Sequence, residues 1–223
     1  ATEGNLVAYT AASLSGASKT IGPAFTKAYP GHKVAFNLDG TQALKTQIEN
    51  GAYADVFISA SNSYTNTLKS ENYLVNDSVK TLTTNYIIVI LPASNPGKIT
   101  SLADLAKPGV KIAMAANTVP VGSATMTVVN NTANSTYGQA WKNSVISNVV
   151  TYETSEPAVA SKVSLGEVDA GFVYQSTASA AAPGTYKTVT IGKADNYLQT
   201  YTIAIMKGST NKAVAAEFEQ FML

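Results

Sequence analysis

The chain has 223 residues, of which 45% are hydrophobic and only 13% are charged, and its formal net charge at neutral pH is +1. A chain of this length can bury a full core as one domain or as two domains of about 100 residues each. The near-neutral charge, without any basic cluster, excludes the electrostatic footprint of a nucleic-acid-binding protein. The absence of cysteine excludes disulfides, thiolate metal sites and a cysteine nucleophile.

Short apolar runs typical of strands alternate with helical patterns along the chain. The first strand is expected at Leu6–Tyr9, and an amphipathic helix with one apolar stripe is expected to follow over Gly16–Tyr29. This alternation predicts an α/β fold whose mostly parallel sheets are flanked by helices. Further strands are expected at Lys33–Leu38, Ala54–Ser59, Tyr86–Leu91, Lys111–Ala115, Val149–Glu153, Gly171–Tyr174, Tyr186–Ile191 and Tyr201–Met206, and further helices at Gln42–Glu49, Ala158–Leu165 and Lys212–Phe221.

Two of these strands resemble each other and divide the chain. Tyr86–Leu91 and Tyr201–Met206 are both almost entirely apolar, and each follows a polar stretch rich in hydroxyl groups. Two such strands side by side could carry the chain from one lobe into another and back. We therefore expect two lobes, with residues 1–84 and 198–223 in lobe I and residues 85–197 in lobe II.

Four corners between a strand and the following helix share the same chemistry, because they are small, carry hydroxyl groups and contain no basic residue. In open α/β sheets, ligands bind beyond the carboxyl ends of the strands. Helix N-termini at that edge offer unpaired N–H groups and a partial positive charge, which suits an anion. One such corner is also an ordinary helix cap, but four together favour an anion site. The corners are Ala11–Ser15, Asp39–Gln42, Asn117–Ser123 and Thr154–Pro157.

No constellation typical of an enzyme accompanies these corners. Gly16-Ala17-Ser18-Lys19-Thr20 lacks the glycines of a nucleotide-binding P-loop, and no Gly-x-Ser-x-Gly nucleophile elbow is present. The single histidine, His32, lies outside the corners, and the acidic residues form no recognisable set of metal ligands. These observations predict a binding protein without a cofactor rather than an enzyme.

Several stretches resemble the ModA-type molybdate-binding proteins of ABC importers, in the same order and over nearly the whole chain. The more specific ones are Gln47–Ala60 (QIENGAYADVFISA) and Gly171–Ser176 (GFVYQS); Ala11–Leu14 and Val119–Gly122 also match. The resemblance implies a type II periplasmic-binding-protein fold with two lobes and two hinge crossings. It further implies a monomer that holds molybdate or tungstate between its lobes and delivers the anion to a membrane permease.

The resemblance also implies five contacts to the oxyanion. Ser13 would donate its hydroxyl and backbone N–H, and Thr41 would do the same where the family usually has serine. Val121 and Glu156 would each donate a backbone N–H, and Tyr174 would donate its phenol. Glu156 departs from the family, which commonly has an apolar residue there, so its carboxylate must point away from the anion. No residue would bind the metal atom directly, and neutral donors imply an affinity that is nearly independent of pH.

Two alternatives stay open from the residues alone. A sulfate- or phosphate-binding protein would have the same fold, and the proton of monohydrogen phosphate would call for a carboxylate acceptor such as Asp39 or Glu156. A sensor module that binds an oxyanion without transporting it would also share both lobes.

The location expected for the protein is extracytoplasmic, in the periplasm or at the cell surface. No apolar stretch approaches the roughly 20 residues needed to span a bilayer. The chain begins at Ala1 without methionine, as expected of a processed, exported product, either free or lipid-anchored through a removed N-terminal segment. Three glycosylation sequons, at Asn76, Asn130 and Asn134, are compatible with this location.

Overall fold

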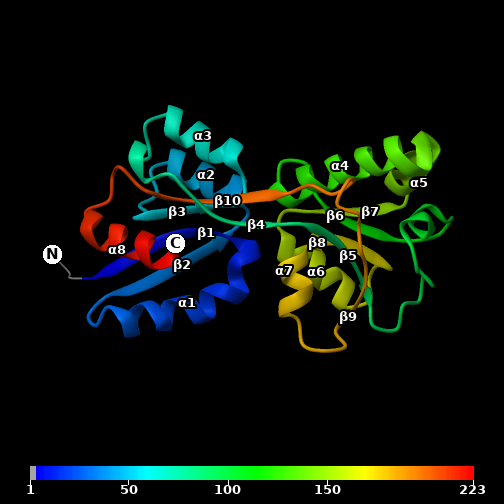
Figure 1. Cartoon of the computed structure of the whole chain (residues 1–223), viewed down its shortest axis with the longest axis horizontal. Coiled ribbons are helices and arrows are strands. Elements are labelled where there is room, and N and C mark those ends of the chain that lie inside the picture. Colours follow the sequence, from blue (N-terminus) through cyan, green and yellow to red (C-terminus); the bar gives the residue numbers. More distant parts are fainter. Residues whose placement is uncertain (1–3) are drawn as a thin grey trace. The chain divides into compact units, whose positions relative to one another are not determined.

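The computed structural model describes residues 4–223, and the chain divides into two compact units (Figure 1). Unit 1 comprises Ala1–Thr84 and Thr200–Leu223, and unit 2 comprises Asn85–Gln199. The chain leaves unit 1 at the end of strand β4 (Lys80–Asn85) and returns to it in strand β10 (Gln199–Ile205). Each unit therefore has its own sheet and its own core.

Unit 1 is built on a five-stranded sheet in the order β2-β1-β3-β10-β4. Strand β1 (Asn5–Ala11) pairs in parallel with β2 (Lys33–Asp39) and with β3 (Val56–Ser59), whereas β10 runs antiparallel to β3. The sheet is therefore mixed: its parallel part consists of the first three strands, and the returning strand closes the other side.

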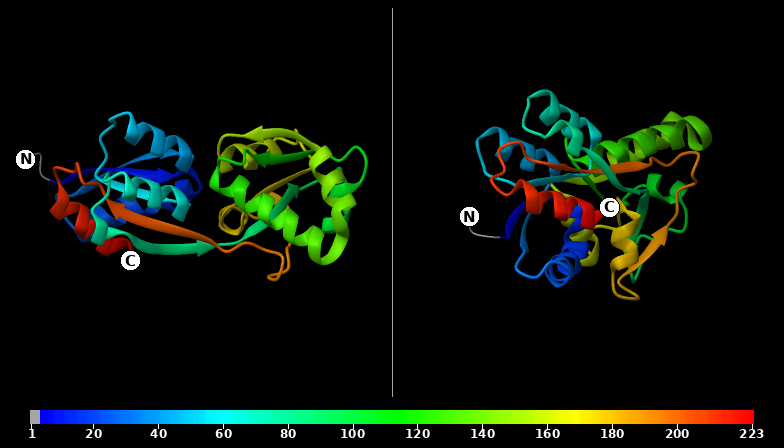
Figure 2. Two further views of the ribbon diagram at one scale, coloured as in Figure 1. Left: turned by 90° about the horizontal axis from the view of Figure 1, so that it is seen from above. Right: turned by 60° about the vertical axis from the view of Figure 1, so that its left-hand side comes forward.

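Helices cover both faces of this sheet, because alternate residues of a strand point to opposite sides. Val56 and Ile58 of β3 pack with Phe25 of one helix and Phe218 of another, whose rings lie 5.0 Å apart. Phe57, between them, packs on the other face. The first face holds α1 (Ser15–Ala28) and α8 (Lys212–Met222); the second holds α2 (Thr41–Glu49) and α3 (Asn62–Ser70) (Figure 2).

Unit 2 repeats this plan with a sheet in the order β7-β6-β8-β5-β9. Strand β6 pairs in parallel with β7 and β8, and β5 runs antiparallel to both β8 and β9. The strands are β5 (Ile87–Pro92), β6 (Ile112–Ala115), β7 (Val149–Glu153), β8 (Ala170–Tyr174) and β9 (Tyr186–Val189), and the helices are α4 (Pro120–Thr132), α5 (Gly138–Ser147), α6 (Glu156–Ser164) and α7 (Gln175–Ala180).

The α/β architecture predicted from the alternating pattern is confirmed, with one strand more than expected. Both sheets are mixed, which corrects the prediction of mostly parallel sheets, because β10 pairs antiparallel with β3, and β5 pairs antiparallel with both β8 and β9. Strand β4, Lys-Thr-Leu-Thr-Thr-Asn, is mostly exposed and lies at the edge of its sheet, beside β10. An edge strand needs few apolar residues, because only one flank and part of one face are covered. Leu82 is the residue of β4 that packs against the core of unit 1. The other residues of the strand are polar, so its sequence looks like that of a loop and does not predict a strand.

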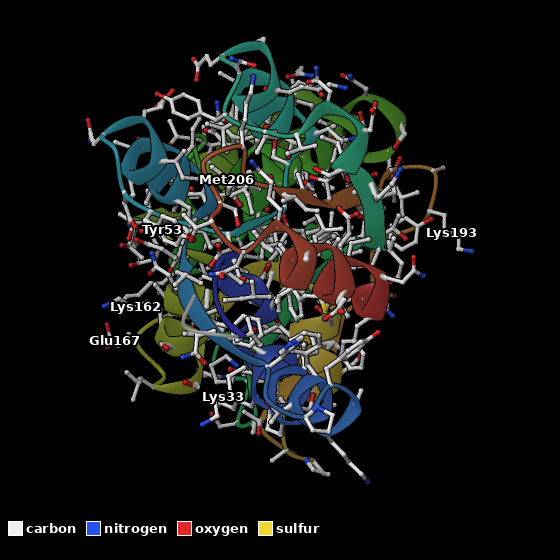
Figure 3. The ribbon with its side chains drawn as sticks, turned by 90° about the vertical axis from the view of Figure 1, so that its left-hand side faces the viewer. Lys33, Tyr53, Lys162, Glu167, Lys193 and Met206 are labelled. Atoms are coloured by element: carbon white, nitrogen blue, oxygen red, sulfur yellow. The ribbon has the colours of Figure 1, made fainter. Side chains whose placement is uncertain are left out.

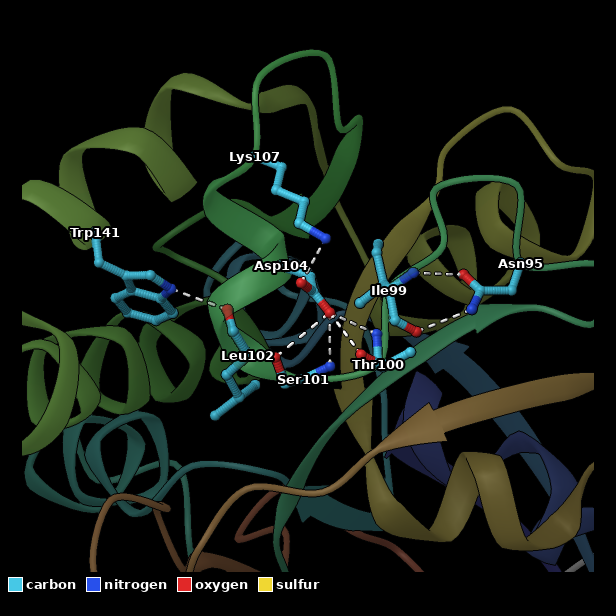
Figure 4. Close-up of polar contacts among 8 residues, drawn as sticks. All are labelled: Asn95, Ile99, Thr100, Ser101, Leu102, Asp104, Lys107 and Trp141. Atoms are coloured by element: carbon cyan, nitrogen blue, oxygen red, sulfur yellow. Dashed lines mark hydrogen bonds and ion pairs between the residues drawn. The ribbon is translucent and has the colours of Figure 1, made fainter.

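The segment between β5 and β6 is held by one carboxylate (Figure 4). Oδ2 of Asp104 accepts the N–H and the hydroxyl of Thr100, at 2.7 and 2.9 Å, and the N–H of Ser101 at 3.0 Å. Its Oδ1 lies 2.7 Å from Nζ of Lys107. The ammonium group of Lys107 makes the largest contribution to lowering the pKa of the Asp104 carboxyl, and the hydrogen-bond donors add to it. Together they hold this pKa well below its usual range. The network caps the short 3-10 helix Leu102–Ala106 and is structural in character.

Candidate functional site

In unit 1, the register of two strands brings the first two predicted corners together. Strands β1 and β2 are parallel neighbours, and Ala11 at the end of β1 pairs with Asp39 at the end of β2. Ser13 and Thr41 each follow two residues later, where the chain turns into a helix. Both predicted hydroxyls therefore lie beyond the same edge of the sheet, at adjacent helix N-termini.

Ser13 lies in the 3-10 turn Ala12–Leu14, which leads directly into α1. Its Oγ lies 2.9 Å from the phenolic oxygen of Tyr201 in β10, and either atom can be the donor. Tyr201 is fully buried, so its hydroxyl has a fixed position in the core. When Tyr201 donates this bond, the Ser13 hydroxyl can donate its own hydrogen bond to a ligand, because a hydroxyl donates one bond while accepting others.

Thr41 is the first residue of α2 and is 1% exposed. Its Oγ1 accepts the backbone N–H of Ala60, just beyond β3, at 3.2 Å. Because Oγ1 is the acceptor in this bond, the Thr41 hydroxyl can still donate a hydrogen bond to a second partner. Asp39 is engaged differently, because its Oδ1 accepts the N–H of Gly40 at 2.7 Å and its Oδ2 accepts Nε2 of Gln47 at 3.3 Å. Both oxygens of the Asp39 carboxylate are thus engaged in hydrogen bonds within the protein.

In unit 2, α4 begins with a proline, which makes Val121 its first residue with an N–H group. Val121 is buried, and the helix start lies very close to the end of β6. A Cβ at Gly122 would lie 2.0 Å from the carbonyl oxygen of Ala116 and 2.5 Å from that of Ala115. Only glycine allows this approach, so Gly122 sets the position of the Val121 N–H.

The second corner of unit 2 starts α6, with Ser155 as the capping residue and Glu156 as the first helical residue. Glu156 is 4% exposed. Its carboxylate Oε1 accepts the backbone N–H of Tyr174 at 3.2 Å and the hydroxyl of Thr177 at 2.5 Å. Burial raises the pKa of the Glu156 carboxyl to about 7, even though both hydrogen bonds act to lower it.

Tyr174 ends strand β8 and is 1% exposed. Its main chain is bound to the Glu156 carboxylate, so two of the five predicted contact residues touch each other. The structure thus places Ser13 and Thr41 in unit 1 and Val121, Glu156 and Tyr174 in unit 2, each at the carboxyl end of a strand or the start of a helix.

Sequence reasoning missed three residues that hold these candidates in place: Tyr201, Ala60 and Thr177. Tyr201 is 188 residues from Ser13, and no sequence pattern links the two. Thr177 lies three residues after Tyr174, about one helical turn along the chain. That spacing is the only feature of the sequence that could have pointed to it.

The candidates hold little charge. Within residues 4–223, no group of three or more His, Asp or Glu side chains is placed to hold a metal ion. The same described range contains no helix with both the length and the apolar character needed to cross a membrane. The chemistry on offer is therefore hydrogen-bond donation from neutral groups, with the Glu156 carboxyl as the single acidic side chain among the candidates.

A cavity of about 400 Å³ in unit 1 lies at the other end of the strands. Figure 3 labels two of its lining residues, Tyr53 and Met206. The lining of the cavity includes Tyr53 and Ala54, which precede β3, and Met206, which follows the antiparallel β10. Ser13 and Thr41 follow the carboxyl ends of strands parallel to β3. The cavity therefore lies at the opposite end of the strands from these two hydroxyls.

Comparison with known proteins places this architecture in a family. The model of the family described as bacterial extracellular solute-binding protein matches residues 6–223. The molybdate-binding protein ModA of Mycobacterium tuberculosis (strain H37Rv) is 33% identical over 214 residues, which cover 96% of this chain and 77% of that protein.

Solved structures show the same fold at lower identity. The periplasmic molybdate-binding protein of Azotobacter vinelandii is 24% identical with a TM-score of 0.83, covering 97% of this chain and 92% of that one. The sulfate-binding protein SubI of M. tuberculosis is 17% identical with a TM-score of 0.84, covering 99% and 82%. The predicted periplasmic-binding-protein fold is thereby confirmed, and the chain belongs to the bacterial extracellular solute-binding proteins, as a ModA-type member.

Proposed function

We propose that this protein binds molybdate or tungstate outside the cytoplasm and delivers the anion to the membrane permease of an ABC importer. The observation that carries the proposal is the pairing of two hydroxyl-bearing helix N-termini, at Ser13 and Thr41, beyond one edge of a parallel sheet. The name of the M. tuberculosis relative, a molybdate-binding protein, supports this choice of ligand.

The chemistry of these corners fits a fully ionised tetrahedral dianion. Such an anion carries no proton and needs only donors, which hydroxyl groups and helix N-termini supply. Since no basic residue is among the candidates, the negative charge would be balanced by backbone dipoles. The residues would contact the oxygens of the anion, and none would bind the metal atom.

We further propose that the two units bind the anion together, with the hydroxyls and backbone N–H groups of Ser13 and Thr41 in unit 1 and the N–H groups and phenol of unit 2 as its donors. The oxygens of a tetrahedral anion point in four directions, so donors on one side of it cannot reach all four with good hydrogen-bond geometry. A ligand shifts a protein between two forms only by its different affinity for them, so the anion would favour the form in which both sets reach it.

Sulfate is the second candidate, because the likeness to a sulfate-binding protein shows that the same fold serves that anion. The fold therefore does not choose between the ligands. Monohydrogen phosphate is less well suited, since both possible acceptors are already engaged. The Asp39 carboxylate is bound to Gly40 and Gln47, and the Glu156 carboxylate is bound to Tyr174 and Thr177. A sensor that binds the oxyanion without transport is the remaining alternative.

Calorimetric titration with molybdate, tungstate, sulfate and phosphate tests the ligand. We expect molybdate and tungstate to bind at least about a hundredfold more tightly than sulfate, a difference of roughly 3 kcal/mol. Equal affinity for sulfate or phosphate would contradict the proposal.

Delivery to the permease can be tested by measuring molybdate uptake in cells of the source organism from which this protein has been deleted. The wild-type protein should restore uptake and Ser13→Ala should restore less of it. Tight binding in solution without any restored uptake would favour the sensor alternative. Gel filtration would test the expected monomer.

A further inference from the structure

One residue of unit 2 combines a candidate anion donor with an acidic side chain. Glu156 is the first residue of α6, so its backbone N–H has no acceptor within the helix. By covalent geometry its carboxyl lies within about 5 Å of that nitrogen, and a hydrogen bond adds about 3 Å. An oxyanion bound to this N–H would therefore lie within about 8 Å of the same residue's carboxyl.

The carboxyl cannot simply turn away into water. It is buried, and its Oε1 accepts both the N–H of Tyr174 and the hydroxyl of Thr177. Releasing it would leave the buried Tyr174 N–H without this acceptor, which is costly in a protein interior. The carboxyl therefore stays beside the corner whatever its protonation state.

The Glu156 carboxyl has no ion-pair partner among the residues that the structure describes. On α6 itself, Lys162 is bound to Glu167 at 2.6 Å. Strands β5 and β6 and helix α7 carry no ionisable side chain. The ionisable side chains on the other elements that touch α6 are Tyr152 and Glu153 in β7, Tyr174 in β8, and Tyr186 and Lys187 in β9.

From this arrangement we infer that Glu156 makes oxyanion binding proton-linked: its carboxyl takes up a proton when a dianion occupies the neighbouring N–H groups. The inference rests on the proposed function and adds a form of pH regulation to the same site. It differs from the pH-independent affinity that the neutral donors alone imply.

The direction follows from the charges. Burial already brings the pKa of Glu156 to about 7, and a dianion close by disfavours the carboxylate further. Below pH 7 the carboxyl is neutral and the anion meets no repulsion. Above pH 7 the anion must either bind beside a carboxylate or bind together with a proton, so the affinity falls as the pH rises.

Calorimetric titration of the wild-type protein with molybdate between pH 6 and 8.5 tests this, since molybdate remains a dianion throughout. We expect about tenfold weaker binding at pH 8.5 than at pH 6. Titrations at pH 8 in buffers with different ionisation enthalpies should show uptake of about half a proton or more per anion.

Three variants test whether the Glu156 carboxyl is the group that takes up the proton. Glu156→Gln keeps an oxygen acceptor for Tyr174 and Thr177 but cannot titrate, so it should lose the pH slope and bind more tightly than wild type at pH 8.5. Glu153→Gln, three residues earlier, is the matched control and should keep the slope. Thr177→Val removes one donor to the carboxylate and should move the slope to higher pH, a readout that remains if Glu156→Gln does not fold.

The outcomes separate this inference from the proposed function. Molybdate binding with the same affinity at every pH and without proton uptake would overturn the inference and leave the proposed function intact. If only sulfate binds at pH 6, the proposed ligand is wrong, and proton uptake with sulfate then decides the inference by the same criterion. A pH slope that survives in Glu156→Gln would also overturn it.

Discussion

The hydroxyl of Ser13 lies 2.9 Å from the buried hydroxyl of Tyr201, which links the first strand-to-helix corner to the strand that returns from unit 2. This bond occupies one hydrogen-bonding position of the Ser13 hydroxyl and holds its oxygen in place. A serine whose hydroxyl is held in this way loses less rotational freedom when it binds a ligand.

Replacing Tyr201 with phenylalanine should therefore weaken molybdate binding without touching the anion directly. The ring still fills its place in the core, but Ser13 loses its partner. We expect about three- to tenfold weaker binding, or roughly 1 kcal/mol, measured by calorimetric titration. The double variant Ser13→Ala/Tyr201→Phe is the control, since it should bind no more weakly than Ser13→Ala alone. Additive losses would mean that Tyr201 acts independently of Ser13.

Thr41 should show two separable effects. Thr41→Ala removes the proposed donor and also the acceptor of the buried Ala60 N–H. We expect about 10- to 100-fold weaker anion binding and a loss of about 1–3 kcal/mol in the free energy of unfolding. Thr41→Ser keeps the hydroxyl and should retain most of the affinity. If Thr41→Ala lowers stability but not affinity, the hydroxyl is a structural cap only.

Gly122 should not tolerate a side chain. In Gly122→Ala the new methyl group would meet the carbonyl oxygens of Ala115 and Ala116 at distances that force the backbone to move. We expect lower stability in a denaturant titration and weaker anion binding, because the Val121 N–H moves with the helix. Gly16→Ala is the matched control: no atom lies within 4 Å of its Cβ position. Within helix α1 this change should be neutral or stabilising by up to about 1 kcal/mol. Equal effects of the two substitutions would contradict the close approach at Gly122.

The stability of the anion-free protein should depend on Glu156. The carboxyl has a pKa of about 7 in the folded chain against 4.5 for the free side chain. The folded state therefore binds the proton more tightly, so the contribution of Glu156 to stability is largest below pH 4.5 and falls as the pH rises toward 7. One pKa unit corresponds to about 1.4 kcal/mol, so the total loss is about 3 kcal/mol. Relative to wild type, Glu156→Gln should gain stability by about this amount between pH 4.5 and pH 8 in urea unfolding. If the difference in unfolding free energy between the two proteins does not change with pH, the predicted contribution of Glu156 is wrong.

Molybdate should make the protein more compact if both units contribute donors to one anion. Small-angle X-ray scattering should then show a smaller radius of gyration after molybdate is added. Ser13→Ala at a molybdate concentration below its dissociation constant is the control and should show no change. An unchanged radius for a saturated wild-type protein would refute the joint binding of the anion by the two units.

The sequence alone was sufficient for the elements whose signal is local. The apolar runs at Tyr86–Leu91 and Tyr201–Met206 mark β5 and β10, because buried strands need such residues along their whole length. The small, hydroxyl-bearing corners could be recognised because the start of a helix has its own local chemistry. The exposed edge strand Lys80–Asn85 could not, since little of its surface is buried.

Only the tertiary structure decided which residues hold the candidate donors. The pairing of Ala11 with Asp39 places Ser13 and Thr41 side by side, and parallel register is a long-range property that no short segment encodes. The partners Tyr201 and Ala60 come from other strands. Likewise, the sequence does not show that the Glu156 carboxyl is buried, and it is burial in the folded chain that raises its pKa.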